Sequence, residues 1–210
     1  TPETQGLIFK YNQENKITND DLEIVFPQGT LYSDLKFDFK KLPKLTSRAF
    51  SSIYQIGNKF VPLHTGFKLA IKADGLPENL QSKALVVSTS GASQGGSFEN
   101  DYVSATPKTF GNFYISVDTL APTIVPLNIS SGKNMAGVSK MRFKIKDNLS
   151  GIKSFNGYVD DRWVLMEFDA KTGTIWYSFD NTVTSGKHTL NLIVSDMKDN
   201  VKEYEINFFR

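Results

Sequence analysis

The chain has 210 residues, which suits one large domain or two small ones. Its composition, 40% hydrophobic and 12% aromatic, excludes a disordered chain, because disordered segments are poor in aromatic residues. The formal net charge is only +2, from 24 basic and 22 acidic side chains, so the basic excess of a nucleic-acid-binding protein is missing. The absence of cysteine excludes disulfides, thiolate metal sites and cysteine nucleophiles.

Alternating hydrophobic and charged residues predict β-strands in the first half of the chain. This period of two is typical of strands with one buried and one exposed face. The predicted strands cover residues 22–26, 35–40, 67–72 and 113–117. Residues 90–97 are rich in serine and glycine and predict a mobile loop. They do not predict a phosphate-binding loop, because neither a Lys-Ser/Thr ending nor a helix follows the glycines.

A break in the alternation follows Val117. The next residues read Asp-Thr-Leu-Ala-Pro-Thr, and Pro122 fixes its own φ angle and favours an extended residue before it. Such a segment is typical of a junction, so we predict a first domain at 1–118 and a second at 119–210. Short strands separated by turn signals indicate β-sandwiches. The expected fold is therefore all-β, with two tandem immunoglobulin-like β-sandwich domains, the first irregular and with long loops.

The second half reads as seven short strands, and the clearest of these cover residues 141–146, 175–179, 189–194 and 204–208. No stretch of the sequence approaches the roughly 20 apolar residues of a membrane-spanning helix. We therefore expect no membrane insertion.

Two polar segments of the second domain predict structural turns. The turn residues are Asp147, Asn148, Ser150 and Gly151 in the first segment, and Asp196 and Asn200 in the second. Side-chain oxygens of Asp and Asn bond to nearby backbone amides, and glycine adopts backbone angles that other residues avoid. The first segment also has oxygen ligands of the kind that Ca²⁺ takes. A turn is the preferred interpretation, since that segment has only one carboxylate, and we predict no metal site in the chain.

Trp163 and Trp176 mark what look like two paired strands. Exposed aromatic residues can stack on sugar rings, although a tryptophan in a sandwich is more often in the core. We expect at least one of the two to be core. Trp163 alternates with Leu165, which predicts that it faces the core, whereas Trp176 alternates with Ser178. Trp176 is therefore expected to be exposed, and Trp176 and its neighbour Tyr177 are the candidate binding residues.

No pattern of catalytic residues is present, so we predict no catalytic site and no cofactor in this chain. His64 and His188 are the only histidines, and neither has the neighbouring ligands of a zinc site. The adjacent pair Asp160 and Asp161 is the only obvious candidate for two-carboxylate catalysis. Adjacent residues point in different directions, so we interpret this pair as a hairpin turn exposed to solvent.

The second domain resembles the C-terminal immunoglobulin-like region of exported zinc endopeptidases of the LytM/lysostaphin type from Bacteroidetes. The segments that carry this resemblance are 118–124, 143–145, 147–152, 156–160, 163–167, 186–188, and 194–196 with 199–200. The first domain resembles the preceding β region of the same family more loosely, through residues 61–64 and 111–118. The zinc-binding elements of that family, H-x-x-x-D and H-x-H, do not occur here, so no catalytic residue is transferred.

The resemblance implies a non-catalytic accessory module that positions or docks a peptidoglycan-directed metallopeptidase. Zinc is then a cofactor of a peptidase domain that lies upstream in the same polypeptide, and that domain is the expected partner, with peptidoglycan or another glycan. The chain begins with Thr1 rather than methionine, and we expect an export signal upstream. The expected location is the periplasm or cell surface of a Gram-negative bacterium. The alternative function is a carbohydrate-binding or adhesion module at the cell surface.

Overall fold

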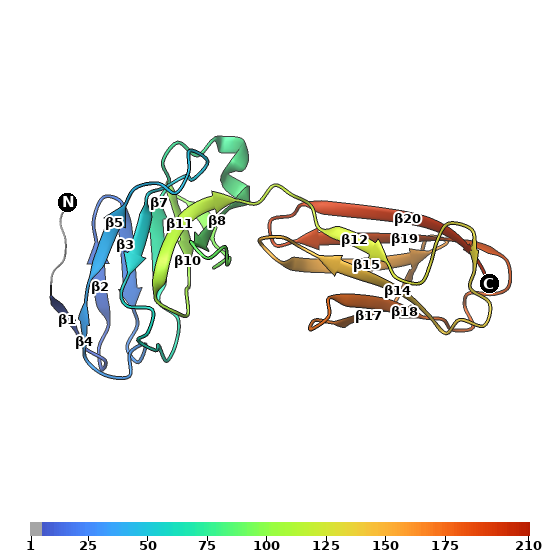
Figure 1. Ribbon diagram of the computed structural model, residues 1–210, viewed down its shortest axis with the longest axis horizontal. Helices are drawn as coiled ribbons and strands as arrows, with labels where there is room; N and C mark the ends of the chain where they lie inside the picture. Colours follow the sequence, from blue (N-terminus) through green and yellow to red (C-terminus); the bar gives the residue numbers. More distant parts are fainter. Residues whose placement is uncertain (1–5) are drawn as a thin grey trace. The chain divides into compact units, whose positions relative to one another are not determined.

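The protein is all-β in its computed structural model, which describes residues 6–210 (Figure 1). The chain divides into two compact units, one ending at Asp118 and the other beginning at Thr119. Each unit is an immunoglobulin-like β-sandwich with two facing sheets around its own hydrophobic core. Within the described range, no helix has the length and apolar character needed to cross a membrane.

From residue 6, where the structure begins to describe the chain, the first unit contains eleven strands and one short 3₁₀ helix, η1 (Glu78–Lys83). The strands are β1 (Leu7–Phe9), β2 (Asn15–Thr18), β3 (Leu22–Phe26), β4 (Leu35–Phe37), β5 (Phe39–Leu42), β6 (Ile53–Ile56), β7 (Lys68–Lys72), β8 (Ala84–Ser88), β9 (Ser97–Glu99), β10 (Tyr102–Ala105) and β11 (Gly111–Val117). One sheet has the order β2-β3-β7-β10-β9 and the facing sheet has the order β5-β6-β11-β8. β1 and β4 form a separate antiparallel pair.

Phenylalanine rings dominate the core of the first unit. Phe26 is fully buried and stacks on Phe67, with ring centroids 4.8 Å apart. Phe37 meets Phe26 edge-on at 5.4 Å, and Phe110 lies 5.8 Å from Phe26. Burial of one such side chain stabilises the fold by about 1.5–3 kcal/mol. These rings come from both sheets and from the β1–β4 pair, so the cluster joins all three.

The alternating run at residues 35–40 forms two strands instead of the single predicted one. The break lies at Asp38, whose carbonyl oxygen accepts a hydrogen bond from the N–H of Gly57 at 3.0 Å. Phe37 pairs with β1, whereas Phe39 pairs with β6. Both phenylalanines are buried, so the predicted burial holds. Alternation reports which side chains are buried, but it does not report that the chain changes sheet between them.

The second unit has nine strands rather than the predicted seven. They are β12 (Thr123–Pro126), β13 (Lys133–Asn134), β14 (Lys140–Lys146), β15 (Ile152–Val159), β16 (Arg162–Val164), β17 (Met166–Asp169), β18 (Thr174–Ser178), β19 (Lys187–Asp196) and β20 (Val201–Phe209). One sheet has the order β12-β14-β18-β17 and the other has the order β13-β20-β19-β15-β16. The chain passes from one sheet to the other at Leu165, between β16 and β17.

Alternation in the second unit separates core from surface as predicted. On β14, Met141, Phe143 and Ile145 are buried and the residues between them are exposed. On β19, Leu190, Leu192 and Val194 are likewise buried. The core therefore lies between the two sheets, and the outer face of each sheet is open to solvent.

Candidate functional site

A hollow of about 720 Å³ lies in the first unit beside the paired strands β6 and β11. Its lining is mainly polar, with side-chain amides, hydroxyl groups, one carboxylate and one lysine beside three phenylalanines. Residues 57–60, 88–94 and 109–113 supply most of the wall. Small-molecule sites in proteins commonly have volumes of about 300–1,000 Å³, so the hollow has the size of a ligand site.

A tight turn holds an aromatic ring at this hollow. Gly57 takes a φ angle of +57°, and its N–H donates to the carbonyl oxygen of Asp38. The Oδ1 atom of Asn58 accepts a hydrogen bond from the N–H of Phe60 at 3.0 Å, a pattern that tightens turns. The Phe60 side chain is 81% exposed, the largest value for a large hydrophobic residue in the described chain. The Nζ atom of Lys59 lies 5.1 Å from the centre of that ring.

The serine- and glycine-rich segment, which was predicted as a loop, is the turn region of a hydrogen-bonded hairpin on another side of the hollow. The N–H of Ser88 donates to the carbonyl of Ala92, and the N–H of Gly91 donates to the carbonyl of Ser88, both at 2.9 Å. The N–H of Gln94 donates to the carbonyl of Val86 at 2.8 Å. These bonds satisfy backbone groups that a mobile loop leaves to water. The hydroxyl groups of the hairpin therefore have defined positions.

Two side-chain amides meet on the strands that border the hollow. Gln55 of β6 and Asn112 of β11 are direct cross-strand neighbours in the antiparallel pair. Within residues 6–210, neither side-chain amide has an intrachain hydrogen-bond partner. Each amide offers two N–H donors and one acceptor oxygen. The carboxylate of Asp38 and the hydroxyl of Thr109 also line the hollow and extend this set.

The arrangement suits binding of a polyhydroxylated ligand better than catalysis. Amide, hydroxyl and carboxylate groups match the donors and acceptors of sugar hydroxyl groups, and an exposed ring can pack on the apolar face of a sugar. Among the described residues that line the hollow, Asp38 is the only acidic one and there is no histidine. Hydrolysis by paired carboxylates needs a second acidic group, and triad chemistry needs a histidine base.

The comparison with protein families concerns this same unit. A family model for the Zu5-like domain matches residues 7–118, just over half of the chain. The chain belongs to the Zu5-like domain family. The Zu5-like domain thus coincides with the first sandwich and contains the whole hollow. The association with LytM-type peptidases and the Bacteroidetes origin stay predictions.

Two solved structures resemble the chain at low sequence identity. An endo-β-1,4-mannanase from Thermotoga petrophila is 15% identical, with a TM-score of 0.36, and the match covers 44% of this chain. The chain spans only 20% of the mannanase chain. Fibronectin(III)-like modules of CbhA from Clostridium thermocellum are 13% identical, with a TM-score of 0.35, and the match covers 69% of this chain and 83% of theirs. No curated protein sequence matches the chain.

Beyond the Zu5-like domain, the predicted positions of the two tryptophans are wrong. Trp163 is 57% exposed instead of core, and its Nε1 atom donates to Oδ1 of Asn156 at 3.2 Å. Trp176 is half-buried, with its Nε1 bonded to Oε1 of Glu167 at 2.7 Å. They lie on β16 and β18, which belong to different sheets and are not paired. The alternation itself holds through this segment, but Val164 and Met166 are the buried residues and Trp163 and Leu165 the exposed ones, so the prediction placed the wrong face inside.

Tyr177 is not a surface residue and is therefore withdrawn as a binding candidate. Its side chain is 2% exposed and belongs to the core of the second unit. The hydroxyl group donates to Oδ1 of Asp180 at 3.0 Å, which satisfies its only polar atom. Of the two predicted binding residues, Trp176 and Tyr177, only Trp176 is partly accessible to solvent.

The first predicted turn has the expected hydrogen bonds. Oδ2 of Asp147 accepts the N–H groups of Leu149 and Gly151 at 2.9 and 2.8 Å. Gly151 has a φ angle of +93°, which favours glycine. Asn148 is exposed and Ser150 is half-buried within this turn.

The second turn repeats the same pattern. Oδ1 of Asp196 accepts the N–H groups of Lys198 and Asn200 at 2.7 and 2.9 Å, and its Oδ2 accepts the side-chain amide of Asn200 at 2.7 Å. The N–H of Met197 donates to the carbonyl of Gly151 at 2.9 Å, so the two turns are bonded to each other. Both turns therefore hold the β15–β19 end of their sheet in register.

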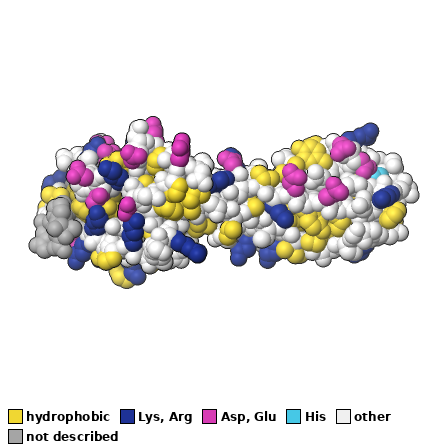
Figure 2. Space-filling view, turned by 90° about the horizontal axis from the view of Figure 1, so that it is seen from above, with side chains coloured by type: hydrophobic (Ala, Val, Ile, Leu, Met, Phe, Trp, Pro, Cys, Tyr) yellow, Lys and Arg dark blue, Asp and Glu magenta, His cyan; other side chains and the backbone are white. Residues whose placement is uncertain are grey.

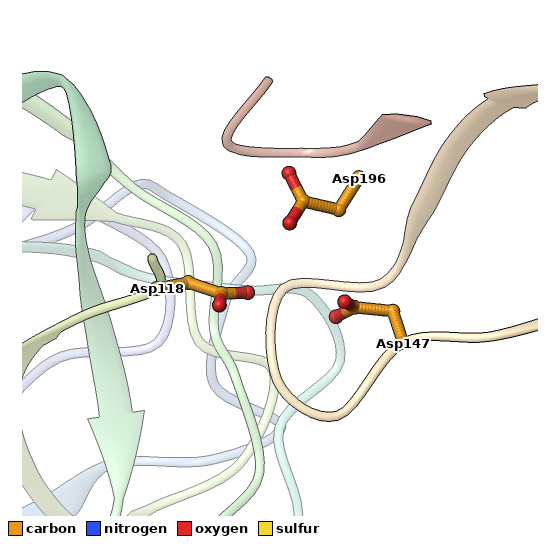
Figure 3. Close-up of side chains that lie close together, drawn as sticks. All are labelled: Asp118, Asp147 and Asp196. Carbon is orange, nitrogen blue, oxygen red and sulfur yellow. The ribbon is translucent and has the colours of Figure 1, made fainter. Parts of the chain in front are cut away.

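Figure 3 labels the carboxylates of Asp147 and Asp196, which belong to these two turns, and that of Asp118, the last residue of the first unit. Within the second unit, one carboxylate oxygen of Asp147 lies within 4.8 Å of one of Asp196. Asp196 is fully buried, Asp118 is 1% exposed, and Oδ1 of Asp147 is buried without a hydrogen bond. Carboxylate oxygens are ligands that Ca²⁺ and Mg²⁺ prefer. Because Asp147 and Asp196 already accept two backbone bonds each, we assign them to the turns.

His188 forms a close pair with Asp160 at the opposite end of β19. The distance from Nδ1 to Oδ2 of Asp160 is 2.6 Å, and Nε2 lies 2.8 Å from the carbonyl oxygen of Thr184. A carbonyl only accepts, so Nε2 carries a proton and neither ring nitrogen is free to act as a base. Burial disfavours the charged ring, but the bonds to Asp160 and Thr184 outweigh it and raise the pKa of His188.

The remaining catalytic candidates are structural or lie at the surface. Asp160 and Asp161 have φ angles of +49° and +64° and form the two-residue turn between β15 and β16. Positive φ angles at both positions are typical of the type I′ hairpin turn, which agrees with the predicted turn. His64 is exposed, and its ring lies edge-on to that of Tyr32 at 5.3 Å.

Sequence reasoning missed the hollow itself. Its lining comes from four separate segments of the Zu5-like domain, and no motif marks them. One signal was available, because Phe60 follows Gly-Asn-Lys in a polar turn, where a buried phenylalanine is not expected. Gln55 gave no signal, since a polar residue on the outer face of a strand is ordinary.

Proposed function

We propose that the Zu5-like domain binds a glycan in its polar hollow, and that the chain is a non-catalytic accessory module. The observation that supports this most directly is the highly exposed ring of Phe60 beside the unpartnered amides of Gln55 and Asn112. An exposed ring offers a stacking surface for the C–H face of a sugar, and the amides offer hydrogen bonds to its hydroxyl groups.

Pre-organisation strengthens this proposal. The ring of Phe60 is placed by the Asn58 turn, and the hairpin hydroxyls are placed by backbone hydrogen bonds. A ligand that binds groups already in position orders few additional side chains, which lowers the entropy cost of binding. Polar groups that are open to water before binding also leave no buried atom unsatisfied in the free protein.

The proposed setting is the cell envelope. We propose that the protein is exported, and that this module positions an enzyme domain of the same polypeptide, a zinc endopeptidase, on peptidoglycan or another glycan. The turn set from Asp147 to Ile152 and from Asp196 to Asn200 supports this setting through the family resemblance. Reading the complete gene tests the peptidase part, which requires H-x-x-x-D and H-x-H elements upstream.

Retention on insoluble peptidoglycan and binding on a neutral glycan array test the proposed function. We expect the full chain to be retained on at least one of these, and the Phe60→Ala variant to bind about tenfold more weakly, since stacking contributes about 1–1.5 kcal/mol. Tyr32→Ala is the matched control, because Tyr32 is 63% exposed in the same unit and does not line the hollow. Absence of binding to every glycan, or equal losses in both variants, contradicts the proposal.

A further inference from the structure

Four cationic side chains form a single row on the outer face of the second unit. Lys140, Arg142, Lys144 and Lys146 alternate along β14 with buried residues, so all four project from the same face of the sheet and are exposed. Residues two apart on a strand are about 7 Å apart, which makes the row about 20 Å long. Within residues 6–210, none of the four forms an ion pair with a carboxylate.

Two acidic residues lie on the strands of the same sheet, and both accept hydrogen bonds there. Glu167 and Asp169 lie on β17, two strands away from β14 in the same sheet. Glu167 accepts hydrogen bonds from Ser178 and Trp176. Asp169 accepts bonds from the hydroxyl and the backbone of its own hairpin, at Thr172 and Lys171. These neutral donors leave both carboxylates charged, but four cations on β14 against two carboxylates on β17 still give this sheet an excess of positive charge.

Charge elsewhere on the surface is mixed. Figure 2 shows basic and acidic side chains interspersed over the visible face of the molecule, with hydrophobic patches between them. The β14 row differs from this pattern, because all four of its side chains are positively charged. Exposed apolar groups lie beside it on the neighbouring strand and its continuation, where Val125 is 51% exposed and Leu127 is 48% exposed.

We propose that this β14 row binds an acidic polysaccharide, a chain that carries a carboxylate on successive sugars. A linear polyanion can lie along one strand and meet several cations in turn, whereas a membrane presents a plane of headgroups to a broad patch. Charge complementarity of this kind raises the rate of association and weakens with salt. The site lies in the second unit and is independent of the hollow in the Zu5-like domain.

Single-stranded nucleic acid fits this face less well. Such ligands stack their bases on aromatic rings, and Trp176 is the aromatic residue next to the row. Its ring is half-buried, Lys140 covers it with Nζ 4.8 Å from the ring centre, and Glu167 holds its N–H. The ring is thus occupied by neighbours within the protein. A sugar polymer needs no such stacking and can use the cations alone.

Binding of polygalacturonate to the full chain tests the proposal. We expect measurable binding at low salt that weakens steadily as salt is added. The double variant Arg142→Glu and Lys144→Glu should bind at least about tenfold more weakly, because it reverses two adjacent charges of the row. The matched control is Lys187→Glu with Lys202→Glu, which makes the same charge change at exposed residues of the other sheet.

Three outcomes overturn the proposal. They are absence of polygalacturonate binding at low salt, equal weakening by both double variants, and tighter binding to a single-stranded oligonucleotide than to polygalacturonate. Circular dichroism of each variant confirms that the fold is intact. The Phe60→Ala variant separates the two sites, since it should leave polygalacturonate binding unchanged. Loss of neutral-glycan binding and loss of polyanion binding therefore report on different residues.

Discussion

Gly57 packs so closely against Phe110 that a Cβ atom at residue 57 would lie 2.6 Å from Cδ1 of the phenylalanine ring. Phe110 belongs to the core of the Zu5-like domain and also lines the hollow. The glycine therefore joins the turn that carries Phe60 directly to the packed interior. This contact places the exposed ring relative to the strands that carry the amides.

The Gly57→Ala variant should lose stability for two reasons. A positive φ angle costs a residue with a side chain about 1–2 kcal/mol, and overpacking adds about 1–3 kcal/mol. Gly75→Ala is the control, because Gly75 also has a positive φ angle but has no atom within 4 Å of its Cβ position. Urea unfolding should show a larger loss for Gly57→Ala. Equal losses would mean that the contact with Phe110 is not significant.

Stability should depend on pH through the pair of His188 and Asp160. The raised pKa of His188 stabilises the fold fully below its ordinary value of 6.5, and this contribution is lost as pH rises through the higher folded value. The pKa of Asp160 is lowered in spite of burial, mainly by the bond from His188. That contribution is present above 3.8 and is lost as pH falls through the lower folded value.

The measurement is the free energy of unfolding at a series of pH values for the wild type and for His188→Gln. The wild type should lose its advantage over the variant as pH rises above 6.5 and through the higher folded pKa of His188, by less than about 1 kcal/mol, because Asp160 is partly exposed. Asp160→Asn should remove the same dependence. Parallel curves for the wild type and the histidine variant would contradict the assignment.

Removal of the Asp196 carboxylate should open the second turn of the C-terminal unit. Asp196 is fully buried and accepts three hydrogen bonds, so Asp196→Ala leaves buried N–H groups unpaired and should cost about 2–4 kcal/mol. Asp196→Asn keeps the acceptor oxygen for Lys198 and Asn200 and should cost less. Thermal unfolding of both variants makes the comparison. A larger loss for the asparagine variant would show that charge, rather than acceptor geometry, matters at this position.

Tryptophan fluorescence should report the reversed burial of the two indoles. Trp163→Phe should remove most of the emission that acrylamide quenches, and it should cost less than about 0.5 kcal/mol, as is usual at the surface. Trp176→Phe should leave the quenchable emission in place and should cost more, since it removes the bond to Glu167. Strong quenching that survives Trp163→Phe would contradict the exposure of that residue.

Much of the fold could be read from local patterns. Met141, Phe143 and Ile145 are buried as their alternation predicts, because side chains on a strand point to opposite faces in turn. The turns at Asp147 and Asp196 were equally readable, because their hydrogen bonds join residues two to four apart. In both cases the cause lies within a few residues of the effect.

Features that depend on pairing of distant strands could not be read in this way. Trp163 is exposed because the core packs on Val164 and Met166, and alternation does not show which of the two faces of a strand is packed. Gln55 and Asn112 lie 57 positions apart in the sequence and share no motif, yet the register of β6 and β11 makes them cross-strand neighbours. The binding candidates were therefore the least predictable part of the chain.

By itself, the sequence determined the all-β class, the alternation of buried and exposed residues on the strands, and the two Asp turns. These features follow from the period of two in strands and from hydrogen bonds between residues close in sequence. Both causes act locally, so they operate in the same way in any strand or turn with those residues. Only the tertiary structure decided where the hollow lies, which tryptophan meets solvent and that His188 reaches Asp160. Those features depend on strand register and on segments brought together by the two cores, and the free energy of packing, rather than local pattern, selects them.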